Sequence, residues 1–195
     1  KCYHCRVVVT LEDRAARADW DAFRARRALE DAILDGAENG LSQRQISARV
    51  GRSQPEVKRL LDRARSRSSR GWPTAAEYAA AVGDELAAGD EDFALRLVVG
   101  ALGVFRQLDV DATGTFLAER PHTGSHRWDV LYRAAMGWVA RERGIPAPSW
   151  TRPPALATWW FVRPEPALAG RAMQRTPVEL ALVGVWIDAE SLRGL

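Results

Sequence analysis

The sequence holds two pairs of residues at spacings typical of zinc ligands. Cys2 and Cys5 are separated by two residues, and His122 and His126 by three. A zinc site commonly takes four ligands from two such pairs. Here the pairs are about 120 residues apart, in what we interpret as two different domains, and the histidines flank a loop. We therefore predict no metal site and no cofactor.

Paired carboxylates are a second candidate for chemistry. Asp109 and Asp111 are spaced as metal-binding aspartates can be, but the Gly-Ser segment of a nucleotidyltransferase is missing around them, and a turn at a helix end explains them more simply. The sequence also lacks a Gly-x-Ser-x-Gly nucleophile motif, a His-Glu-x-x-His zinc motif, a Walker loop and a dinucleotide fingerprint. We therefore expect that the protein is not an enzyme.

The most informative polar side chains lie in the segment LSQRQISARVGRSQPEVKRLLDRAR, residues 41–65. Glutamine pairs with adenine through two hydrogen bonds, lysine and arginine pair with guanine, and glutamate accepts from cytosine N4. The candidates for contacts with base edges are Gln54, Glu56, Lys58 and Arg59.

Positive charge is concentrated in the same region. Residues 41–70 contain nine Lys and Arg against two Asp and Glu, whereas residues 71–195 contain 12 against 15. A local excess of this kind is typical of a surface that binds a polyanion. Contacts to phosphate position a protein on DNA without reading its sequence. The candidates for that role are Ser42, Arg44, Arg49, Arg52, Ser53, Arg63, Arg65 and Arg67.

Two short helices and a tight turn would hold these side chains. Ser42 and Ser53 are natural N-caps, Gly51 suits a turn that needs positive φ, and Pro55 fits a first helical turn. Apolar residues would pack the two helices together as a helix-turn-helix, whose second helix enters the major groove. These residues are Ile46, Val50, Val57, Leu60 and Leu61.

The rest of the chain favours a mainly α fold. Residues 11–34 have the composition and apolar spacing of one long helix, which Gly36 and the Asn39-Gly40 pair would end. The polar segment 65–73 marks a boundary between a three-helix domain, residues 1–70, and a helical C-terminal domain, residues 71–195. In the second domain we expect helices over 93–108 and 128–142, and at most a short strand within 182–187.

Composition agrees with an ordinary globular protein, at 47% hydrophobic and 27% charged residues. We see neither an apolar run of about 18 residues nor a signal peptide, so we expect a cytoplasmic protein without a membrane partner.

Tryptophan is concentrated in the C-terminal half, which has six of the eight. Most of these should fill a core. Trp159 and Trp160 are adjacent and cannot both face one helical core, so we take this pair as the candidate partner-binding site.

Two segments resemble known families. Residues 41–65 resemble the helix-turn-helix of bacterial repressors and simple transposases, except that Ser47 replaces the usual alanine and Arg52 a usually apolar turn residue. The segments HRWD (126–129), PAPSWT (146–151), WWF (159–161) and VWIDA (185–189) resemble the C-terminal region of actinobacterial helix-turn-helix proteins that lie beside toxin-like genes.

That second resemblance implies an antitoxin-type transcriptional regulator. Its N-terminal domain would bind operator DNA and repress its own operon, and its C-terminal domain would bind a cognate toxin. Two alternatives remain: a one-component repressor whose C-terminal domain senses a small molecule, and an accessory protein of a recombinase or transposase. If the protein is a repressor, a homodimer on a pseudo-palindromic operator is possible, because many such repressors bind as dimers.

Overall fold

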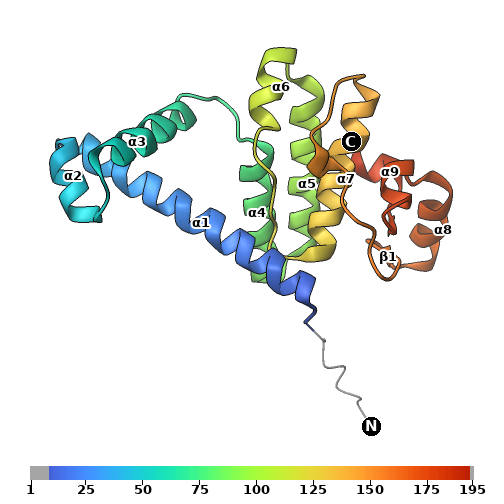
Figure 1. Ribbon diagram of the computed structural model, residues 1–195. Coiled ribbons are helices and arrows are strands. Elements are labelled where there is room, and N and C mark those ends of the chain that lie inside the picture. The colour runs from blue at the N-terminus through green and yellow to red at the C-terminus, as the bar shows by residue number, and fades with distance from the viewer. Residues whose placement is uncertain (1–8, 194–195) are drawn as a thin grey trace, which may run out of the picture. The chain divides into compact units, whose positions relative to one another are not determined.

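The computed structural model describes residues 9–193 and is mainly helical over that range, which confirms the expected fold class at this level (Figure 1). None of the helices in the described range is long and apolar enough to cross a membrane. Contacts divide the chain into two units. The smaller unit is Asp21–Pro73, and the larger consists of residues 9–20 and 74–193.

The smaller unit is a bundle of three helical segments around one apolar cluster. Helix α1 (Leu11–Glu38) contributes its part from Asp21 onward, followed by α2 (Gln43–Val50) and α3 (Gln54–Ser68). Each fully buried aliphatic side chain stabilises such a bundle by about 1.5–3 kcal/mol. The buried cluster consists of Ile33, Ile46, Val57, Leu60 and Leu61.

Helix α1 continues past Gly36, where the sequence indicates a stop, and ends at Glu38. A Cβ atom at Gly36 would lie 3.5 Å from Leu41 and 3.6 Å from Ile46, which is ordinary van der Waals contact, so this glycine faces apolar side chains from within the helix. The chain turns at the Asn39-Gly40 pair instead. There the Asn39 Nδ2 donates to the Asp35 carbonyl at 2.8 Å, and Gly40 has a φ of 82°.

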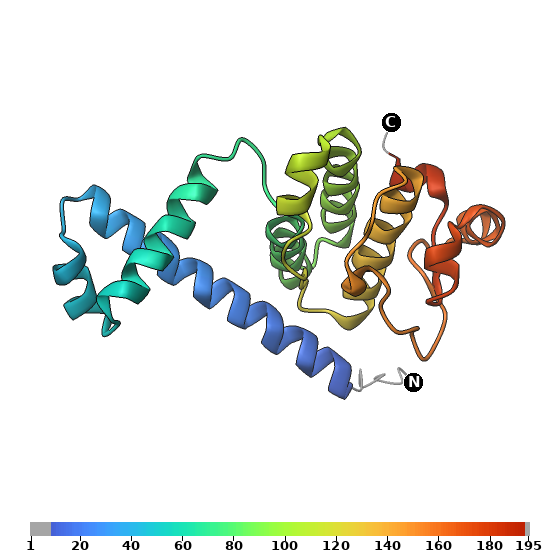
Figure 2. The same cartoon turned by 45° about the horizontal axis from the view of Figure 1, so that its top comes forward.

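The larger unit is built around helix α7, which is buried along most of its length. Helices α4, α5 and α7 lie side by side in both views (Figures 1 and 2). Besides the first part of α1, the larger unit contains the helices α4 (Ala75–Ala88), α5 (Glu91–Gln107), α6 (Val110–Phe116), α7 (His126–Glu142), α8 (Pro166–Arg175) and α9 (Val178–Ala181), with 3-10 turns at Ser149–Thr151 and Ala189–Leu192.

A buried ion pair fixes the loop that precedes α7. Arg133 donates to Asp129 at 2.8 Å and to the carbonyl of Pro121 at 2.6 Å, and Asp129 also accepts from the backbone and hydroxyl of Thr123. Burial raises the pKa of Asp129, and the Arg133 guanidinium and the Thr123 hydrogen bonds oppose that rise. The pair therefore joins the loop to the most buried helix.

A two-stranded parallel sheet lies near the C-terminus. Strand β1 (Trp160–Phe161) pairs with β2 (Val185–Trp186), with Trp160 opposite Val185. The second strand lies inside the predicted segment 182–187, and the first was not predicted.

The first part of α1 belongs by its contacts to the larger unit, whereas the sequence placed all of it in the N-terminal domain. The buried Trp20 indole donates from Nε1 to the Ala80 carbonyl at 3.1 Å. It passes so close to Gly83 that a Cβ there would lie 2.3 Å from the same nitrogen. Helix α4 therefore needs a glycine where this tryptophan packs.

Candidate nucleic-acid interface

Capping residues define both helices of the predicted motif. The Ser42 hydroxyl accepts from the Gln45 backbone, and the Gln45 side chain accepts from the Ser42 backbone at 2.8 Å, which is a complete capping box. Gly51 ends α2 in the left-handed region with a φ of 65°. Ser53, the last of the three residues between the helices, caps α3 by accepting from the Glu56 backbone.

A hydrogen bond across the turn accounts for Ser47. Its hydroxyl donates to the carbonyl of Arg52, which holds the end of α2 to the turn. Alanine, the usual residue at this position of the resembling motif, has no hydroxyl with which to do so. The Arg52 side chain is exposed, and its guanidinium lies 3.7 Å from the Glu56 carboxylate.

Helix α3 presents one face to the core of the smaller unit and the opposite face to solvent. Val57, Leu60, Leu61 and Ala64 are buried. We call the solvent-facing side of the helix the α3 outer face. It contains a shallow hollow of about 450 Å³. It is lined by Pro55, Lys58, Arg59, Asp62, Arg63 and Ser66.

Several predicted contact residues are exposed and have unengaged side chains. Within residues 9–193 they have neither an ion pair nor a side-chain hydrogen bond, so their charge is available to a ligand. They are the arginines Arg44, Arg49, Arg59, Arg63 and Arg65. Gln54, in the first turn of α3, is exposed as well.

Other predicted contact residues already have partners. The Lys58 ammonium lies 2.9 Å from the Asp62 carboxylate. Arg67 is only 18% exposed, and its guanidinium forms ion pairs with Glu30 and Asp31 of α1. The Ser42 and Ser53 hydroxyls serve as helix caps. The structure thus separates unpaired cations from cations that already have a carboxylate partner.

Asp62 is the residue of this face that sequence reasoning missed. Its distance of four residues from Lys58 was a readable signal, because such residues are neighbours on a helix surface. It stands between cations on a face otherwise suited to a polyanion.

Of the candidate zinc ligands, the structure describes His122 and His126. In the part of the chain that the structure describes, no group of three or more His, Cys, Asp or Glu is placed to hold a metal ion. Cys2 and Cys5 lie outside the described residues. His122 instead contacts Asp19 at 3.3 Å, and Asp109 caps α6 by accepting from the Ala112 backbone at 2.7 Å.

The two adjacent tryptophans have different surroundings. Trp159 is 69% exposed and lies against Trp186, at 5.3 Å between ring centroids. Trp160 packs on the buried Trp128 at 5.4 Å, with the Arg127 guanidinium over its ring. The pair also lines a cavity of about 790 Å³ beside the first turns of α1 and α7. Trp159 is therefore the more exposed of the two candidate residues.

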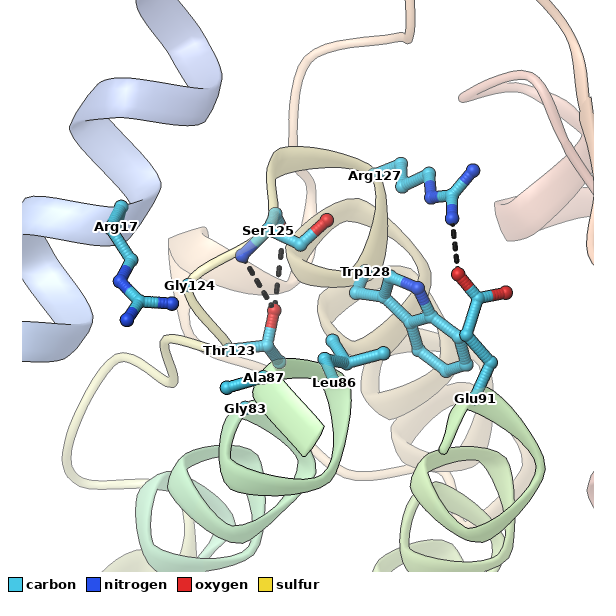
Figure 3. A pocket seen from close by; sticks show the side chains of 10 residues that line it. All are labelled: Arg17, Gly83, Leu86, Ala87, Glu91, Thr123, Gly124, Ser125, Arg127 and Trp128. Carbon is cyan, nitrogen blue, oxygen red and sulfur yellow. Dashed lines mark hydrogen bonds and ion pairs between the residues drawn. The ribbon is translucent and has the colours of Figure 1, made fainter. Parts of the chain in front are cut away.

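A smaller cavity of about 200 Å³ lies in the larger unit, where α4, the starts of α5 and α7 and the first part of α1 meet (Figure 3). An ion pair between Arg127 and Glu91 stands at one side of it, and Arg17 lies at the other. Trp128, Leu86 and Gly83 supply apolar surface. Its lining thus combines charged and apolar side chains.

The α2–α3 pair thus combines a rigid turn, an exposed helix face and free guanidinium groups. Guanidinium groups bind phosphate oxygens and the guanine edge through paired hydrogen bonds. The α2–α3 pair is therefore the candidate nucleic-acid interface of the described chain. Comparisons with protein-family models, with curated proteins and with solved structures find no match to this chain.

Proposed function

We propose that this protein is a sequence-specific DNA-binding transcriptional regulator that binds duplex DNA through its helix-turn-helix, α2 and α3. The observation that carries the proposal is the set of five exposed, unpaired arginines on these two helices. Charge supports it: Asp21–Pro73 contains 12 Lys and Arg against 7 Asp and Glu, and the rest of the chain 16 against 18. The cations are therefore concentrated on the unit that carries the motif.

The proposed complex places α3 in the major groove, with α2 across the backbone. Gln54 and Arg59 would then face base edges, with Lys58 beside them. Arg44 and Arg49 on α2, with Arg63 and Arg65 on α3, would bind phosphates. Each correct base contact of this kind contributes about 1–3 kcal/mol of discrimination.

The test begins with selection of preferred duplexes from a random pool by the purified chain. Binding to the selected duplex and to a shuffled duplex is then measured for Lys58→Ala/Arg59→Ala. We expect loss of the preference for the selected duplex, with helical content unchanged, because both side chains are exposed. The matched control is Arg152→Ala/Arg171→Ala, which removes two exposed, unpaired arginines of the larger unit. Equal losses in both variants would contradict the proposal.

We further propose that the larger unit binds a protein partner, and that this partner is a cognate toxin. The exposure of Trp159 supports the first point, and the resemblance of the C-terminal segments supports the second. Co-expression with the product of the adjacent gene tests both. Trp159→Ala should weaken that complex at least tenfold, since exposed tryptophans are common binding hot spots. A stoichiometric complex that tolerates this change would exclude Trp159 from the interface.

The second candidate is control by a small molecule, and the cavity of Figure 3 favours it. A metabolite that releases the chain from DNA without a protein partner would support this reading over the toxin. Arg127→Ala, at the side of the cavity, should then reduce the response to the metabolite.

A further inference from the structure

A carboxylate stands on the α3 outer face, the surface proposed to approach DNA. Asp62 has a side chain that is 55% exposed, and Lys58 and Arg63 line the hollow with it. Helix α3 has one other acidic residue, Glu56, which is in the first turn and faces Arg52. Asp62 is thus the acidic residue of the outer face.

Such a carboxylate opposes DNA binding in general. Duplex DNA carries about one negative charge per 1.7 Å of its axis, and a carboxylate in the contact surface is repelled by several of them. On random DNA nothing offsets this repulsion, so it weakens non-specific binding in full. On a matched sequence, a base contact by the neighbouring Lys58 would offset part of it.

Asp62 also controls where the Lys58 ammonium can go. Their charged groups are 2.9 Å apart, and they are four residues apart on one helix, or about 6 Å along its axis. A lysine side chain is otherwise flexible and binds phosphate readily as a point charge. The ion pair therefore biases the Lys58 ammonium toward Asp62, on the α3 outer face.

From these two effects we infer that Asp62 determines the sequence discrimination of the helix-turn-helix: it positions Lys58 for a base edge and repels phosphates wherever the bases do not match. Asp62 acts as a positioning and discriminating residue, without reading a base itself. The inference rests on the proposed function and deepens it.

The experiment compares the full chain with Asp62→Asn by fluorescence anisotropy, on the selected duplex and on a random-sequence duplex. Asparagine keeps the size of the side chain and removes its charge. We expect binding to random DNA to become about three- to tenfold tighter, because one repulsive charge is lost. Binding to the selected duplex should change less, so that the ratio of the two affinities falls.

The salt dependence separates positioning from charge alone. If Asp62→Asn releases Lys58 to a phosphate, the slope of log K against log salt on random DNA should steepen by about 0.9. In a Lys58→Gln background, the same change should leave the slope unaltered. Asp111→Asn is the control for net charge, since Asp111 is exposed on α6 in the larger unit.

The outcomes are distinct. If the original chain binds no duplex, the proposed function fails and this inference fails with it. If it binds DNA but Asp62→Asn matches Asp111→Asn on both duplexes, the inference alone is overturned. An unchanged affinity ratio with an unchanged salt slope would overturn it as well.

Discussion

Single arginines on α3 with similar positions in the sequence have different roles in the structure. Arg65 and Arg67 are two residues apart, and both belong to the basic segment from which phosphate contacts were predicted. Arg65 is exposed and unpaired within the described chain, whereas Arg67 pairs with the buried Glu30. Glu30 also accepts from Arg27 at 3.0 Å. Charge alone does not distinguish a cation that binds a ligand from one that neutralises the core.

The two arginines should therefore respond differently to replacement. Arg67→Ala leaves the buried Glu30 with one cation, and we expect the smaller unit to lose about 2 kcal/mol of stability. Amide hydrogens of α2 and α3 would then exchange about 30-fold faster. Arg65→Ala should leave exchange unchanged and reduce the magnitude of the salt slope for DNA by about 0.9. If instead Arg67→Ala reduced the salt slope and Arg65→Ala accelerated the exchange, Arg67 would be the phosphate contact.

At the scale of elements, the sequence predicted best those helices and turns that are determined by residues close together in the chain. The α2–α3 pair follows from two serine caps, Gly51 and apolar residues at helical spacing, all within 25 residues. The Lys58–Asp62 pair was equally local and was overlooked. The ion pairs of Arg67 could not be predicted in this way, because its partners lie more than 35 positions away on α1.

The small sheet could not be predicted either, because its two strands are far apart in the sequence. Trp160 pairs with Val185, and each strand has only two residues, too few for an alternating pattern. The different surroundings of Trp159 and Trp160 follow from this strand, since successive residues of a strand face opposite sides. The sequence showed that the two rings must differ, but the exposed one became identifiable only with the strand in place.

Helix packing in the larger unit depends on glycines that have no space for a side chain, and Gly83 is the tightest of them in the described chain. At Gly83 a Cβ would lie 2.3 Å from the Trp20 Nε1 and 2.5 Å from the Thr123 carbonyl, so Gly83→Ala must displace α1 or the loop. We expect a loss of about 3 kcal/mol or more, which lowers Tm by about 10 °C.

A second helical glycine provides the control for this prediction. Gly100 in α5 has open space around its Cβ position, and Gly100→Ala should stabilise the chain by about 0.5–1 kcal/mol. Thermal unfolding followed by circular dichroism measures both variants. Equal shifts in Tm would mean that helix propensity, and not packing against Trp20, governs Gly83.

For the whole molecule, the distribution of charge matters more than its sum. The formal net charge is only +3 over 195 residues. It combines a smaller unit with a balance of +5 and a remainder with a balance of −2. A chain of low net charge can therefore present a strongly cationic surface to DNA, while the remainder adds no attraction.

The salt dependence of DNA binding should accordingly follow the local cations. If Arg44, Arg49, Arg63 and Arg65 each bind a phosphate, the slope of log K against log salt on random duplex should be about −3.6 between roughly 50 and 200 mM salt. Arg44→Ala/Arg49→Ala should bring it to about −1.8. Arg152→Ala/Arg171→Ala lowers the net charge of the chain by the same two units and should leave the slope near −3.6, because these side chains lie outside the motif. Since the two double variants have identical net charge, any difference between their slopes reports position alone, and coincident slopes would show that the charge of the whole chain, and not the helix-turn-helix, attracts DNA.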